Sequence, residues 1–247
     1  MTLATPRPHR VLRVVLVTVA VAAVGLGAVG VLGYCSVFGC TLFAQDFEPW
    51  GEEAVAARAA AVPAATEFAD GAAAGGRVVA DATRDGCRTG QNNWKIKDTY
   101  SHECEVDVSR LVVLTADRAS VGEALTSADA TIRALGCLPS GPRGGRGLDG
   151  VRAEYWREDN PQVARYGAAG LPSAGYDCPG GRTLEAQPTS ASRSRVSAHD
   201  LTDGTPFLDD VLADDWYTAQ DLRVLRESRA ELALVVTVTD GYYRTRF

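Results

Sequence analysis

Hydrophobic positions divide the chain into one uninterrupted apolar run and a longer region of mixed patterns. The run Val14–Gly33 contains no charged side chain. A helix of that length rises roughly 30 Å, which is enough to cross the hydrocarbon core of a bilayer. The sequence therefore predicts a transmembrane helix at residues 14–33, a tail at 1–13, a juxtamembrane segment at 34–50 and one domain at 51–247.

The charges beside the apolar run predict its orientation. Three arginines precede the run, whereas the first basic residue after it is Arg58. By the positive-inside rule, the N-terminus is cytoplasmic and the C-terminal domain is extracellular, anchored in the cell membrane by a single pass. Two other routes stay open: Ala28-Val29-Gly30 offers a signal-peptidase site and Cys40 a lipoprotein site. The length of the run favours an uncleaved anchor in the lipid bilayer.

Small residues form a stripe along one face of this predicted span, at Ala20, Ala23, Gly27 and Gly30. Such a stripe allows a second helix to approach closely, so weak self-association through the span is one hypothesis. The other is that small residues are simply common in the membrane helix of an alanine-rich protein.

Two helices stand out in the region after the anchor. Glu52–Val62 has acidic residues in its first turn, where they suit the positive end of the helix dipole, and Pro63 ends or bends it. Ser120–Leu135 has an apolar stripe and a capping box formed by Ser120 and Glu123. Thr205-Pro206 is expected to open a third, short helix whose apolar side is Phe207, Leu208, Val211 and Leu212.

Alternating patterns predict several strands. In Tyr100–Ser109, Cys104 and Val106 are expected in the core, and the acidic side of the strand is expected in water. Leu232–Thr239 is a β-branched strand, followed by a tight turn at Asp240-Gly241 and a return strand at Tyr242–Phe247. Weaker patterns occur at Arg77–Thr83, Val151–Trp156, Thr183–Ala186 and Arg195–Ala198.

Short connections between these strands favour antiparallel pairing, and the helices precede groups of strands. This order is typical of an α+β fold, with an antiparallel sheet and helices packed on one of its faces.

All six cysteines follow the apolar run, as expected for disulfides in an oxidising compartment. Local spacing favours three pairs: Cys35–Cys40, Cys87–Cys104 and Cys137–Cys178. The second pair would clamp a hairpin. The third would pin the end of the Ser120–Leu135 helix to the glycine-rich loop Gly170–Gly181.

Net charge argues against nucleic-acid binding. The chain has 25 basic residues, three of them in the tail, so the rest carries 22 against 31 acidic residues. An acidic domain repels phosphate backbones.

Several catalytic motifs are absent or lack the right context. Gly145–Gly150 matches G-x-G-x-x-G, but it follows a glycine-rich loop and is expected to enter a strand, so no cofactor is predicted. The sequence contains no G-x-S-x-G and no H-E-x-x-H. His102 and His199 are the two histidines after the span, too few for a multi-histidine metal site.

Two polar groups remain as candidate sites. The acidic cluster could bind calcium, although its spacing is more typical of a solvated face: Asp200, Asp203, Asp209, Asp210, Asp214 and Asp215. The segment inside the second cysteine pair is a candidate recognition loop: Gln91, Asn92, Asn93, Trp94 and Lys95. The alternative is that Trp94 folds back onto the sheet.

The arginine-flanked span, the nearby pair Cys35 and Cys40 and an outer domain rich in alanine and arginine resemble membrane-anchored exported proteins of actinobacteria. This resemblance implies topology and carries no activity. The leading hypothesis is a non-enzymatic domain that binds an envelope protein or cell-wall component, or acts as an accessory subunit in the envelope. The alternative is an anchored hydrolase that uses carboxylates.

Overall fold

The computed structural model describes residues 51–90, 97–141, 145–157, 159–191, 210–215 and 217–246, without the side chains of 210, 211, 213 and 214. The chain forms two compact units. The larger comprises 48–89 and 102–246. The predicted span Val14–Gly33 lies outside the described residues, among which no helix is long and apolar enough to cross a membrane.

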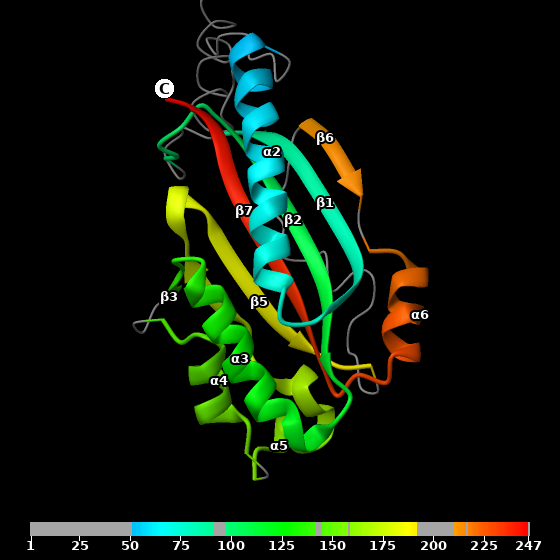
Figure 1. Cartoon of the computed structure of the whole chain (residues 1–247). Helices are drawn as coiled ribbons and strands as arrows, with labels where there is room; N and C mark the ends of the chain where they lie inside the picture. Colours follow the sequence, from blue (N-terminus) through cyan, green and yellow to red (C-terminus); the bar gives the residue numbers. More distant parts are fainter. Residues whose placement is uncertain are drawn as a thin grey trace, which may run out of the picture. The chain divides into compact units, whose positions relative to one another are not determined.

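A seven-stranded sheet forms the centre of the larger unit (Figure 1). Its order is β3-β4-β5-β7-β2-β1-β6, and every neighbouring pair is antiparallel. The fold is therefore α+β, as predicted. The strands are β1 Arg77–Thr89, β2 His102–Thr115, β3 Leu138–Ser140, β4 Ala174–Asp177, β5 Thr183–Thr189, β6 Asp210–Asp215 and β7 Leu232–Thr245.

Helices lie on both faces of this sheet. Those described are α2 Glu52–Ala73, α3 Val121–Ala134, α4 Leu148–Tyr155, α5 Pro161–Tyr166 and α6 Ala219–Glu227. The first four share one core with Val106, Val108, Val236 and Val238 of the central strands. In contrast, Leu225 of α6 packs with Leu111 and Val235 on the opposite face. The expectation that helices pack on one face therefore holds for α2 to α5 only.

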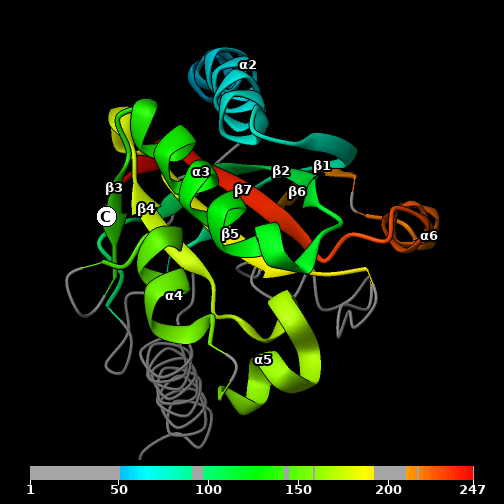
Figure 2. The same cartoon turned by 60° about the horizontal axis from the view of Figure 1, so that its bottom comes forward.

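Helix α2 crosses over β7 and β2 (Figures 1 and 2) and buries a row of alanines: Ala54, Ala61, Ala65, Ala69 and Ala72. The helix continues through Pro63, which is exposed, instead of ending there. The alanine row runs past the proline on both sides. Burial of this row offsets the roughly 3 kcal/mol by which an interior proline destabilises a helix.

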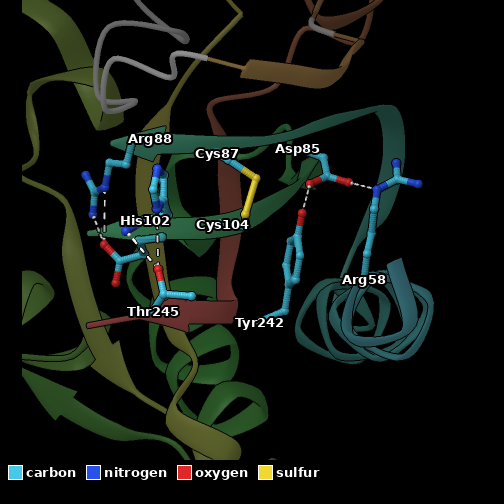
Figure 3. The surroundings of a disulfide bond; sticks show 9 residues. Arg58, Asp85, Cys87, Arg88, His102, Cys104, Tyr242 and Thr245 are labelled. Atoms are coloured by element: carbon cyan, nitrogen blue, oxygen red, sulfur yellow. Dashed lines mark hydrogen bonds and ion pairs between the residues drawn. A yellow bond between two sulfur atoms is a disulfide. The ribbon is translucent and has the colours of Figure 1, made fainter. Parts of the chain in front are cut away.

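Ion pairs add directional contacts to this small-residue packing. Arg58 of α2 pairs with Asp85 of β1, which is fully buried and also accepts a 2.8 Å hydrogen bond from the Tyr242 hydroxyl of β7 (Figure 3). Asp70 near the other end of α2 accepts a 2.7 Å bond from Arg110 of β2. Charged partners therefore fix where α2 lies along the sheet.

The C-terminal hairpin prediction is wrong. Strand β7 continues through Asp240-Gly241 to Thr245. Asp240 and Gly241 pair with Val106 and Glu105 of β2, so the backbone stays in the sheet there. Asp240 accepts a 2.7 Å bond from Arg182 instead of starting a turn. The register shift against Cys104 and Glu105 leaves Tyr242 as a bulge residue, and its hydroxyl reaches Asp85.

Three further local predictions are corrected. The strand expected at Val151–Trp156 is helix α4, whose buried Leu148 and Val151 have helical spacing. The helix expected to include Val211 and Leu212 is strand β6 there, because the open edge of β1 accepts it. The loop expected at Gly170–Gly181 contains β4, which pairs with β3 and β5.

The cap of α3 also differs from the prediction. Ser120 makes no side-chain cap bond to its own helix, and its hydroxyl donates to Asp117 at 2.7 Å instead. The helix itself lies close to where it was expected.

Replacing Asp85 by asparagine tests the attachment of α2. We expect the free energy of unfolding to fall by about 2 kcal/mol, because an amide keeps the size but loses the charge that accepts from Arg58. Asp81→Asn is the matched control, since Asp81 is exposed on the same strand. Urea denaturation of the full chain measures both variants, and equal losses would contradict this role of Asp85.

Candidate functional site

The two cysteine pairs within the described residues are those predicted: Cys87–Cys104 and Cys137–Cys178. The third predicted pair, Cys35–Cys40, lies outside the described residues. Cys87 and Cys104 face each other directly across β1 and β2 (Figure 3). This register places Arg88 opposite Glu103 and Arg84 opposite Asp107, on the face of the sheet away from α2. We call that side the second face.

The acidic side of β2 is not in water, contrary to prediction. Glu105 is 8% exposed, Asp107 6% and Ser109 1%. The physical reason is that β2 is an inner strand between β1 and β7, and polar side chains of these neighbours meet its own. Alternation alone distinguishes polar from apolar faces, but it does not distinguish a polar interior from a wet surface.

The buried carboxyl group of Glu105 has no short contact with the nearby Arg88. Arg88 donates to Glu103 at 2.6 Å but lies 3.7 Å from the Oε2 atom of Glu105. The Oε1 atom of Glu105 is buried and has no hydrogen-bond partner among the described residues. Burial raises the pKa of Glu105, and the charges of Asp107 and Glu103 raise it further, against the opposing effects of Arg88 and Arg84.

Asp107 shares this environment. Burial raises the pKa of Asp107, while a hydrogen bond from Thr239 and the charges of Arg84 and Arg88 act in the other direction. Glu105 and Asp107 lie two residues apart on one face of β2. Chemically, the pair can hold a proton and accept hydrogen bonds from a donor.

A chain of hydroxyl groups continues the second face beyond Asp107. The Tyr217 hydroxyl donates to Ser109 Oγ at 3.0 Å, and Ser109 Oγ lies 2.9 Å from Thr237 Oγ1. Burial raises the pKa of Tyr217 well above its usual range, so the phenol keeps its proton. These contacts attach the segment that leads into α6 to the centre of the sheet.

Most of the other predicted candidates lie outside the described residues. Gln91, Asn92, Asn93, Trp94 and Lys95 lie outside the described residues, as do His199, Asp200, Asp203 and Asp209. Asp210, Asp214 and Asp215 belong to the edge strand β6. The ring of His102 lies 3.4 Å from the Thr245 hydroxyl. Within the described part of the chain, no three acidic, histidine or cysteine side chains group as metal ligands do.

The Gly145–Gly150 motif enters helix α4 and not the strand expected. Gly147 is needed for close packing, because a Cβ there would collide with the carboxylate of Asp129. The Tyr176 hydroxyl donates to Asp129 and accepts from the amide of Leu148, both at 2.7 Å. The first amide of α4 is thus bonded to the protein's own tyrosine.

Comparison with protein-family models, curated proteins and solved structures finds no match for this chain.

The buried pair Glu105 and Asp107 is the feature that sequence reasoning missed, although a signal was present. Once Cys87 is paired with Cys104, the register follows, and it sets an arginine of β1 opposite an acid of β2 at two positions. Such cross-strand pairs indicate an organised charged face.

The hydroxyl chain predicts an order of stabilities. Ser109→Ala removes the partner shared by Tyr217 and Thr237, so we expect a loss of about 2 kcal/mol in unfolding free energy. Tyr217→Phe leaves the Ser109–Thr237 contact in place and should cost about 1 kcal/mol. Urea denaturation measures both, and a larger loss for Tyr217→Phe would contradict the arrangement.

Proposed function

We propose that this protein is a membrane-anchored, extracellular binding domain of the cell envelope that attaches to a protein or cell-wall component without catalysing a reaction. The observation that carries the proposal is the pair of disulfides across the domain, at Cys87–Cys104 and Cys137–Cys178. Disulfides persist in oxidising compartments, which agrees with the outward orientation predicted by the flanking charges.

The second face supplies a surface suited to binding. On β5, Thr183, Glu185 and Gln187 are exposed there, whereas Leu184 and Ala186 between them are buried on the α2 side. Strand β5 is held between β4 and β7, so these hydrogen-bonding side chains stand on a fixed backbone. Exposed polar groups on a rigid strand favour recognition of a polar partner.

One observation favours a second candidate, an anchored hydrolase that uses carboxylates. Glu105 and Asp107 are two buried acids on the same strand, and burial raises the pKa of each. Enzymes that cleave glycosidic bonds use a pair of acids with distinct protonation states. Release of soluble fragments from purified cell-wall polymer, lost in Glu105→Gln and Asp107→Asn, would establish this candidate and overturn the first.

Photo-crosslinking in intact cells tests the binding proposal. A photoreactive residue replaces Glu185 on the second face of the full chain, and the control carries it in place of Glu67, which is exposed on α2 at the other side of the sheet. We expect position 185 to cross-link to one component located outside the membrane, with little product from position 67. A cytoplasmic partner, equal products from both positions, or no product would contradict the proposal.

A further inference from the structure

Glu105 and Asp107 form a local concentration of negative charge inside the protein. Both residues are more than nine-tenths buried and lie on the same face of β2. One oxygen of Glu105 accepts no hydrogen bond from the described residues. A buried carboxylate without full hydrogen bonding is costly, and adding a proton removes most of that cost.

The positive charges that face Glu105 and Asp107 offset the negative charge of this pair only in part. Strand β1 contributes Arg84 and Arg88, and Arg88 makes its short contact with Glu103 rather than with Glu105. Arg244 of β7 also approaches Glu103, at 3.6 Å, and Thr239 donates to Asp107. Among the described side chains further along the second face, exposed Glu185 of β5 lies beyond β7, and the Tyr217 phenol bonds Ser109. Asp214 of β6 is opposite Arg84 in the backbone register.

We propose that Glu105 and Asp107 form a proton-binding site that makes the centre of the sheet more stable in mildly acidic surroundings than at neutral pH. The site is independent of the binding function proposed above, since it follows from the environment of the two carboxyl groups alone. Proton uptake relieves both the desolvation of the charged acids and the repulsion between them.

The direction of the effect follows from linkage. In the unfolded chain both acids titrate near their ordinary values of about 4, whereas burial raises the pKa of each in the folded protein. Between these values the folded state holds more protons than the unfolded state. The stability that the pair contributes is therefore fully present below about pH 4 and is lost as the pH rises through the folded-state pKa.

Thermal unfolding of the full chain in detergent micelles tests the proposal at about pH 5 and about pH 7. Glu105→Gln and Asp107→Asn remove one titrating group each, and Glu185→Gln removes an exposed acid from the same face as a matched control. We expect each of the first two variants to change the difference in Tm between the two pH values by about 3 °C, in the sense of a smaller acid stabilisation. The control should keep the wild-type difference, and an unchanged difference in Glu105→Gln and Asp107→Asn would overturn the proposal.

A titration of the unmodified protein gives an independent measurement if either variant fails to fold. The carboxyl carbons of Glu105 and Asp107 report their own protonation in carbon-13 NMR spectra. We expect at least one of the two to titrate above its ordinary value. Ordinary midpoints for both buried acids would overturn the proposal.

Discussion

The register between β1 and β2 is the constraint on which the rest of the structure depends. Cys87 and Cys104 stand opposite each other with their Cα atoms 4.0 Å apart, joined by a disulfide. A shift of one residue would turn every side chain of a strand to the other face of the sheet. In the observed register, Asp85 is on the side of α2, while Arg84 and Arg88 are on the second face. One covalent link therefore fixes which charges meet on each side.

The two faces use this register differently. On the α2 side, alanines allow the helix to lie close to the strands, and buried Asp85 joins α2, β1 and β7 through Arg58 and Tyr242. On the second face, the same strands gather acids, arginines and hydroxyl groups that contact one another. The α2 side is thus held mainly by apolar packing, whereas the second face combines the apolar cluster around Leu225 of α6 with buried acids and an exposed polar strand.

Sequence patterns predicted the features that depend on local order. Cysteine spacing indicated both observed disulfides, and the stripe of residues 120–135 indicated α3. The errors arose where neighbouring strands decide the outcome. Asp240-Gly241 has the composition of a turn, but pairing with β2 keeps it in the sheet. Alternation places Glu105 on the polar side of its strand, where a solvated residue is expected. That strand is an inner one, however, and its neighbours in the sheet cannot be identified from the alternation within it.

Proton NMR on the full, oxidised chain measures the register between β1 and β2 directly. Narrow pairs in an antiparallel ladder bring opposite Hα protons into close contact at every second position. With Cys87 opposite Cys104, we expect strong Hα–Hα contacts between Asp85 and Val106 and between Thr83 and Val108. Contacts displaced by one residue, such as Asp85 with Glu105 or with Asp107, would contradict this register.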